Sequence, residues 1–207
     1  MSKLCVDVSS WQVGIDWAKF KEQGVEHAII RAGFGSSVSQ KDTMFESHMN
    51  GALAAGIKVG VYWFGYAYSA DIGRKEADIC HEVIKAYKDK ITLPVFYDWE
   101  YDSMKYANAN GVYPDKKLVT DITIAFMERI KELGYQTGFY TNYDYMENKY
   151  DSPRLRSYNL WFAYYSDNKP EYDCIIQQFT ASGRLAGYNG ALDCNRVYKD
   201  FGQAEEP

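Results

Sequence analysis

Two carboxylates two positions apart, Asp98 and Glu100, follow a short apolar run at residues 95–97, with Pro94 in front. A short run of β-favouring residues behind a proline predicts a buried strand. Because side chains alternate along a strand, the two acids should point to one side and Trp99 to the other. Repulsion between them would raise one pKa and provide a proton donor beside an ionised partner. The pair is therefore a candidate for acid–base chemistry, although a lone Asp-x-Glu is more often a solvated strand end.

The composition limits the classes of function. A chain of 207 residues with 46% hydrophobic and 25% charged residues fits one soluble globular domain. Its 19 tyrosines offer flat amphipathic faces of the kind that line sugar-binding grooves. A net charge of −5 without a Lys/Arg cluster argues against a nucleic-acid partner. No apolar run approaches the ~18 residues that span a bilayer, so we expect no membrane insertion.

The four cysteines, Cys5, Cys80, Cys174 and Cys194, form no CxxC motif and no metal-like group with histidines. We expect reduced and mostly buried thiols, no structural zinc and no cofactor; one disulfide stays open. The first residues lead into an apolar strand without a signal-peptide core or cleavage site. The sequence thus predicts a protein made without a secretion signal, which acts in the cytoplasm, leaves by lysis or an accessory route, or has lost a leader.

Helices and strands alternate along the first two thirds of the chain. Three units repeat a helix, a glycine, a short polar step and an apolar strand, at Gly24, Gly56 and Gly134. Such alternation implies parallel strands with right-handed crossovers. The predicted strands are residues 4–8, 27–32, 58–66, 95–100, 137–141, 160–163, 175–179 and 192–195. The predicted helices are residues 15–23, 43–55, 70–88 and 115–133, with a long polar loop at 101–114 and no full helix beyond 142.

We predict an α/β fold, an irregular (β/α) barrel with about eight strands and fewer than eight helices. Residues 1–200 would form a single catalytic barrel domain, and 201–207 a disordered tail. A doubly wound open sheet is the alternative, but no Gly-rich phosphate loop supports it.

Four carboxylates fall near predicted strand ends: Asp7, Asp98, Glu100 and Asp193. In a barrel, the C-terminal ends of strands face the active site. The first and last strands of a closed barrel are neighbours, so Asp7 and Asp193 should lie close together. Four converging acids without a nearby histidine favour acid–base chemistry on a neutral or basic substrate. Binding of a divalent metal by these carboxylates is the weaker option.

Ten short motifs follow one another from Asp7 to Asn195, and their order and spacing are more specific than any one of them. They are DVSSWQ (7–12), IDW (15–17), IIRA (29–32), GVYWF (60–64), DWE (98–100), GFYT (138–141), LWFA (160–163), QFT (178–180), SG (182–183) and DCN (193–195). In this series the chain resembles glycoside hydrolase family 25, the lysozyme-like muramidases of bacteria and phage endolysins.

The resemblance implies a barrel enzyme that cuts the β-1,4 bond between N-acetylmuramic acid and N-acetylglucosamine in bacterial cell-wall peptidoglycan. It implies Glu100 as the general acid that protonates the leaving oxygen. Asp98 would orient the N-acetyl group of the substrate for attack on the anomeric carbon, while Asp7 and Asp193 would position the site and tune its charge. We expect a monomer. The groove residues implied by the same match are Arg31, Tyr62, Tyr140, Trp161 and Gln178.

Two departures from the family pattern stand beside the motifs. Gln177 occupies a position where the family often has Trp, which could alter one sugar subsite, and Trp63 replaces a frequent His. Trp63 and Trp99 have the opposite strand parity to the acids, so we expect both beneath helices.

Other readings of the acidic pair stay open. The ~6.6 Å between Cα atoms two residues apart on a strand lies between the retaining and inverting carboxyl spacings. A non-catalytic glycan-binding barrel and a chitinase-like hydrolase are the alternatives. Residues 91–96 lack the acidic run that a chitinase-like enzyme would carry before its acidic pair.

Overall fold

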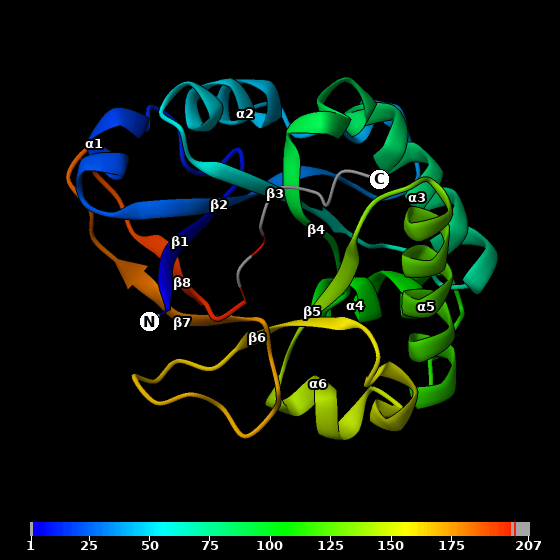
Figure 1. Cartoon of the computed structure of the whole chain (residues 1–207). Coiled ribbons are helices and arrows are strands. Elements are labelled where there is room, and N and C mark those ends of the chain that lie inside the picture. The colour runs from blue at the N-terminus through cyan, green and yellow to red at the C-terminus, as the bar shows by residue number, and fades with distance from the viewer. Residues whose placement is uncertain (1, 200, 202–207) are drawn as a thin grey trace.

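Eight strands close into a barrel in the computed structural model, which describes residues 2–199 and 201. Each strand pairs with the next along the chain, and β8 returns to pair with β1 (Figure 1). The strands are β1 (Lys3–Val8), β2 (Val25–Phe34), β3 (Lys58–Phe64), β4 (Ile91–Asp98), β5 (Thr137–Asn142), β6 (Asn159–Ala163), β7 (Ile176–Gly183) and β8 (Leu192–Val197). The closed order confirms the irregular α/β barrel and rules out the open doubly wound sheet.

Six α-helices, all in the first three quarters of the described chain, accompany the eight strands, fewer than eight as predicted. They are α1 (Trp17–Glu22), α2 (Phe45–Ala54), α3 (Ala70–Ile84), α4 (Tyr101–Ala109), α5 (Lys116–Glu132) and α6 (Tyr143–Asn148). Short 3-10 helices occupy Val38–Gln40, Lys85–Lys90 and Ser152–Leu155. Figure 1 shows α3 and α5 packed side by side on one flank of the barrel, whereas loops join β6 to β7 and β7 to β8.

The predicted helix–glycine–strand units are confirmed, and local chemistry explains their ends. Asp16 begins α1 by accepting a hydrogen bond from the Lys19 amide, and Asp115 does the same for α5 through the Leu118 amide. Gly24 follows α1 with φ +87°, a left-handed conformation that favours glycine at a helix end. The chain then turns directly into the next strand.

β8 departs from the parallel arrangement of the other seven strands. It runs antiparallel to both β7 and β1, while β1 to β7 pair in parallel. The connection at residues 184–191 is too short for a helical crossover, which a parallel pair needs. Asp193 therefore lies near the start of β8, not at its C-terminal end, yet the reversed strand brings it to the same barrel mouth as Asp7.

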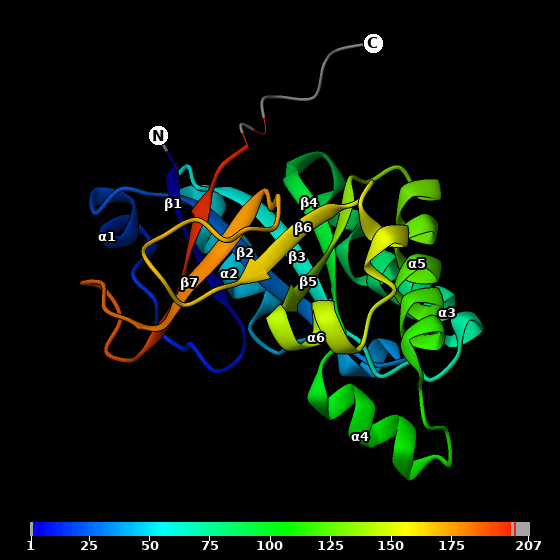
Figure 2. The same cartoon turned by 90° about the horizontal axis from the view of Figure 1, so that it is seen from below.

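The loop predicted at 101–114 is wrong in its first half, because α4 begins directly after Glu100. Ser103 and Ala107 are its buried residues, and the helix extends away from the barrel (Figure 2). A helix with so little buried surface carries no apolar periodicity for sequence reasoning to detect. The predicted helix at 70–88 also changes at Ile84 into the 3-10 turn, and β4 begins at Ile91.

Strand parity divides the core into an interior and an outer layer, as predicted for the two tryptophans. Trp63 and Trp99 are fully buried with the outer layer, between strands and helices, and their indole N–H groups donate to the Gly35 and Ala67 carbonyls. The interior layer consists of Cys5, Ile29, Leu93, Phe96, Tyr140, Trp161, Ile176, Val197 and Phe201, the last of which is 3% exposed. Residues 202–207 of the predicted tail lie outside the described residues.

All four cysteines are buried free thiols, which confirms the prediction of reduced cysteines. Within residues 2–199 and 201, no helix combines the length and the apolar character needed to cross a membrane.

Candidate active site at the barrel mouth

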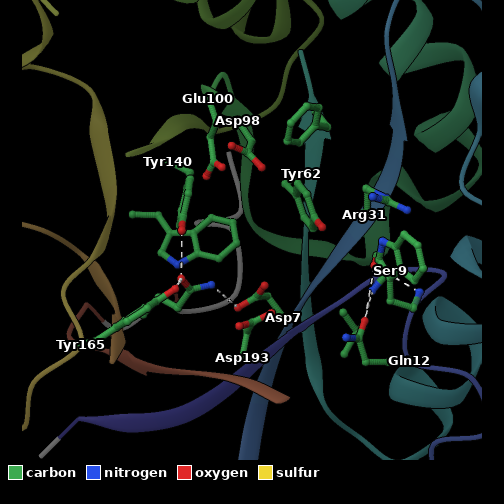
Figure 3. A pocket seen from close by; sticks show the side chains of 15 residues that line it. Asp7, Ser9, Gln12, Arg31, Tyr62, Asp98, Glu100, Tyr140, Tyr165 and Asp193 are labelled. Carbon is green, nitrogen blue, oxygen red and sulfur yellow. Dashed lines mark hydrogen bonds between the residues drawn. The ribbon is translucent and has the colours of Figure 1, made fainter. Parts of the chain in front are cut away.

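The nine predicted site residues line one pocket of about 330 Å³ at the mouth of the barrel (Figure 3). They are Asp7, Arg31, Tyr62, Asp98, Glu100, Tyr140, Trp161, Gln178 and Asp193. The volume lies in the range of small-ligand sites. In Figure 3 the carboxyl groups of Asp98 and Glu100 lie together on one side of the pocket, and those of Asp7 and Asp193 on another. The structure thus brings all the predicted residues together as two pairs of acids.

Asp98 is the last residue of β4, and Glu100 is the residue from which α4 begins. The backbone around them is held on both sides. Gly65 N–H donates to the Asp98 carbonyl at 2.8 Å, and Glu100 N–H donates to Ser103 Oγ at 3.0 Å. The Ser103 hydroxyl in turn donates to the Gly65 carbonyl at 2.6 Å. The loop after β3 therefore fixes the segment that carries both acids.

Glu76 of α3 anchors that loop from behind, and sequence reasoning missed it. Its side chain is fully buried and accepts hydrogen bonds from the Tyr66 amide at 2.8 Å and from the Tyr97 hydroxyl at 2.6 Å. Burial raises the pKa of Glu76 to about 7, although the Tyr97 and Tyr66 hydrogen bonds act against the shift. The sequence offered one signal for a buried, functional Glu76, namely its position among the apolar residues on the buried face of α3.

Burial dominates the electrostatics of the Asp98–Glu100 pair. It raises the pKa of both carboxyls, and the charge of Glu100 raises the pKa of Asp98 further. Asp98 Oδ1 is buried without a hydrogen-bond partner, so this oxygen has a vacant acceptor position. The two carboxyls lie together (Figure 3), and acids this close titrate as a unit, so the raised pKa values belong to the pair.

Asp7 and Asp193 form the second pair, directly opposite each other across β1 and β8, as predicted from barrel closure. Asp7 Oδ2 accepts from Asn195 Nδ2 at 2.7 Å and from Gln178 Nε2 at 3.1 Å. Burial, and then the neighbouring Asp193 charge, raise the pKa of Asp7 to about 7 against the effect of the two amides. Burial also raises the pKa of Asp193. Asn195 was not predicted as a site residue, since its role depends on the register of β8.

The floor of the pocket is aromatic. The Trp161 ring lies 4.6 Å from that of Tyr140 and 5.8 Å from that of Tyr62, both edge-on. Trp161 Nε1 donates to Asn195 Oδ1 at 2.7 Å, and the Tyr140 hydroxyl donates to Gln178 Oε1 at 2.9 Å. The rings are therefore oriented by the same amides that hold Asp7.

Arg31 lines the pocket but is engaged behind it. Its Nε lies 2.6 Å from the buried Asp42 carboxylate, and a terminal nitrogen donates to Ser10 Oγ at 2.8 Å. Asp42 also accepts from the Ser10 and Met44 amides, so the ion pair fixes the loop after β1. Arg31 thus supplies a positive charge at the pocket wall without pairing with the four acids.

Tyr165 is a pocket residue that the sequence analysis missed, and Gln177 positions it. Gln177 is fully buried, is not among the residues that line the pocket, and donates through Nε2 to the carbonyls of Tyr164, Ser166 and Asn168. These bonds hold the loop from which the Tyr165 hydroxyl reaches Gln178 Oε1 at 3.2 Å. Any effect of Gln177 on a sugar subsite therefore acts through this loop.

Five further lining residues were not predicted: Val8, Ser9, Trp11, Gln12 and Phe64. All of these except Phe64 belong to the motif at residues 7–12, in which the resemblance had assigned a role only to Asp7. Across the part of the chain that the structure describes, no three His, Cys, Asp or Glu side chains are grouped as ligands for one metal ion.

Comparison with known proteins places this barrel in a family. The family model for glycosyl hydrolases family 25 matches residues 6–188. Lysozyme M1 of Streptomyces globisporus is 26% identical over 202 residues, 92% of this chain and 66% of that protein. A family 25 glycosyl hydrolase structure from Bacillus anthracis is 28% identical with a TM-score of 0.78, over 96% of this chain and 89% of that one.

The modular autolysin LytC of Streptococcus pneumoniae, solved with a synthetic peptidoglycan ligand, has a TM-score of 0.81 at 25% identity. The match covers 95% of this chain and 47% of LytC. The chain spans between 53% and 66% of the length of the curated relatives it matches. Because the family model covers nearly all of the barrel, including three of the four acids, the chain belongs to glycosyl hydrolases family 25.

Proposed function

We propose that this protein is a lysozyme that hydrolyses the β-1,4 bond between N-acetylmuramic acid and N-acetylglucosamine in peptidoglycan. The observation that carries the proposal is the placement of two carboxylate pairs around one aromatic-floored pocket at the mouth of a family 25 barrel. The relatives named lysozyme, and the autolysin solved with a peptidoglycan ligand, support the substrate class.

Glu100 acts as the general acid in this proposal, and Asp98 prepares the internal nucleophile. Burial raises the pKa of both carboxyls of the Asp98–Glu100 pair, which favours the protonated acid that the first step needs. The unpartnered Asp98 Oδ1 is suited to accept a hydrogen bond from the N–H of the substrate's N-acetyl group. That bond favours the ionised form of Asp98, so the shared proton moves to Glu100, from which it is donated to the leaving glycosidic oxygen.

The carbonyl oxygen of the oriented N-acetyl group then attacks the anomeric carbon as the glycosidic bond breaks. Glu100, now ionised, accepts a proton from the water that opens the cyclic intermediate. This double displacement retains the anomeric configuration, and substrate assistance is a known exception to the two-carboxylate scheme.

Asp7 and Asp193 set the charge on the opposite side of the pocket. Their cross-strand contact and the pKa of about 7 for Asp7 limit the negative charge that they carry together near neutral pH. Negative charge that remains would stabilise the positive charge that develops at the anomeric carbon. The two amides on Asp7 Oδ2 hold its other oxygen in a fixed orientation.

The direct test is to digest purified peptidoglycan, reduce the new ends with borohydride and identify them by mass spectrometry. The proposal predicts reduced muramic acid at every new end. Reduced N-acetylglucosamine would identify a glucosaminidase instead. Saturable wall binding without new reducing ends would identify a glycan-binding barrel.

A further inference from the structure

A second hollow of about 620 Å³ adjoins the candidate active site, and Trp11 lines both. The hollow lies between the loop that leads into α1 and the loop that joins β7 to β8. Its lining residues are Trp11, Val13, Gly14, Gly187, Tyr188 and Asn189. We call it the Trp11 groove. None of these residues carries a charged side chain, in contrast to the four acids of the neighbouring pocket.

Trp11 is exposed in a way that the other tryptophans are not. Its relative exposure is 79%, whereas Trp17, Trp63, Trp99 and Trp161 are all at or below 7%. Val13 beside it is 63% exposed. An indole ring left in water forgoes a large burial energy, and its flat face suits the apolar face of a sugar ring. The proposed mechanism gives this residue no role.

The groove is built on fixed backbone. The Tyr188 hydroxyl donates to the Trp11 carbonyl at 3.2 Å, and Asp16 N–H donates to the Gly187 carbonyl at 2.9 Å. The Gln23 amide bonds both backbone groups of Ala186, at 2.6 Å and 2.9 Å. The Tyr188 and Asp16 bonds join the two loops, which are far apart in sequence, and the Gln23 bonds tie the β7–β8 loop to the end of α1. The exposed indole therefore stands on a preorganised wall, which lowers the entropy cost of binding.

On the Ser9 side, the same loop is tied to the catalytic pocket. Trp11 N–H donates to Ser9 Oγ at 3.3 Å, and Ser9 N–H donates to Gln12 Oε1 at 3.0 Å. Ser9 and Gln12 line the central pocket, where Figure 3 shows them beside Arg31. Because Trp11 lines both hollows, a polymer held at the four acids can continue from the central pocket over the Trp11 ring.

We propose that the Trp11 groove binds a further saccharide unit of the same glycan strand, next to the units held in the central pocket. The inference rests on the proposed function, because that function makes the ligand a linear polymer of aminosugars. The uncharged lining favours the sugar rings and their N-acetyl groups over the ionised groups of a stem peptide. The groove therefore makes affinity depend on chain length.

Binding of peptide-free glycan strands of defined length tests the proposal without requiring turnover. The measurements use Glu100→Gln protein, which leaves the ligand uncut, and compare a disaccharide with a hexasaccharide by calorimetry. We expect the hexasaccharide to bind more tightly, and Trp11→Ala in this background to reduce that length advantage about tenfold, equivalent to about 1.4 kcal/mol. Trp11→Tyr, which keeps a flat ring, should recover most of it.

The matched control is Tyr113→Ala, which removes a ring that is 80% exposed and lines neither hollow. It should leave the length advantage unchanged. An undiminished length advantage in Trp11→Ala would overturn the proposal, as would a gain in affinity that appears only when the strand carries stem peptides. A wild-type protein that fails to cut peptidoglycan would contradict the proposed function. The binding measurements would still decide whether the Trp11 groove holds a saccharide, because they do not depend on turnover.

Discussion

Asp7 on β1 and Asp193 on β8 are direct cross-strand partners at a seam where the two strands run antiparallel. Like charges in such positions are destabilising unless one group is neutral. Burial raises the pKa of both carboxyls and so favours their neutral forms. Two side-chain amides donate to Asp7 Oδ2 and stabilise its ionised form. The pair is therefore a place where folding stability and site electrostatics are linked.

The pKa of Asp7 makes a prediction about stability against pH. Its folded value of about 7 lies above the ordinary 3.8, so between these values the folded protein binds more protons than the unfolded chain. This group therefore lowers the free energy of unfolding as pH rises through that window. The Asp7→Asn variant does not have this titration, so between the two pKa values its free energy of unfolding should rise relative to that of wild type by about 1.4 kcal/mol for each pH unit. Urea unfolding at several pH values measures the difference. Equal slopes for variant and wild type would contradict the assignment; exposed Asp71→Asn is the control.

Asn195 links Asp7 to the aromatic floor, which predicts a large cost for its loss. Asn195→Leu leaves Asp7 Oδ2 with one donor fewer and Trp161 Nε1 without its acceptor, both in buried surroundings. Each unsatisfied group costs about 1–3 kcal/mol. Chemical denaturation should show a loss of at least that size, while Asn108→Leu, on the exposed side of α4, should change stability by less than about 0.5 kcal/mol. Similar small effects at both sites would refute the link.

Glu76 should affect catalysis without touching the substrate. Glu76→Ala removes the acceptor for the Tyr66 amide and the Tyr97 hydroxyl, and so loosens the loop that holds the Asp98 carbonyl. We expect kcat to fall about tenfold with little change in KM, and unfolding free energy to fall by about 1–3 kcal/mol. Glu76→Gln, which keeps one acceptor oxygen, should recover most of kcat. A stability loss with unaltered kcat would show a purely structural role.

Gln177 should act through Tyr165, which a double-mutant cycle can test. Gln177→Leu breaks three hydrogen bonds to the loop that carries Tyr165, so KM should rise while kcat changes little. Tyr165→Ala should raise KM as well, and the double variant should be no worse than Tyr165→Ala alone. Additive effects in the double variant would mean that the two residues act independently.

Whereas the five groove residues came only from the resemblance to the family, period-two reasoning along the strands recovered part of the site directly from the sequence. It placed Asp98 inside the barrel and Trp63 and Trp99 outside, as observed. Barrel closure correctly predicted the contact between Asp7 and Asp193. These inferences succeeded because they depend on alternation and on neighbouring strands, both of which the sequence pattern carries.

What could not be predicted depends on long-range packing. α4 has little buried surface, so its sequence lacks an apolar stripe. The reversal of β8 follows from a connection whose length only the strand boundaries reveal. Asn195 and Glu76 act through partners distant in sequence, and Tyr165 lies on a loop without regular structure. For these residues, the chemistry became visible only once register and contacts were known.

The most direct measurement is the release of soluble muropeptides by wild type and by Glu100→Gln, with equal folding checked by circular dichroism and urea unfolding. The substitution keeps the shape of the side chain and removes its ability to donate the catalytic proton. We predict a fall in rate of about 10²–10⁴-fold, the usual contribution of a general acid. Asp71→Asn, at an exposed acid on α3 that is not among the groups shifting the pKa of Glu100, should leave the rate near that of wild type. A Glu100→Gln protein that is folded and releases muropeptides at the wild-type rate would contradict the account.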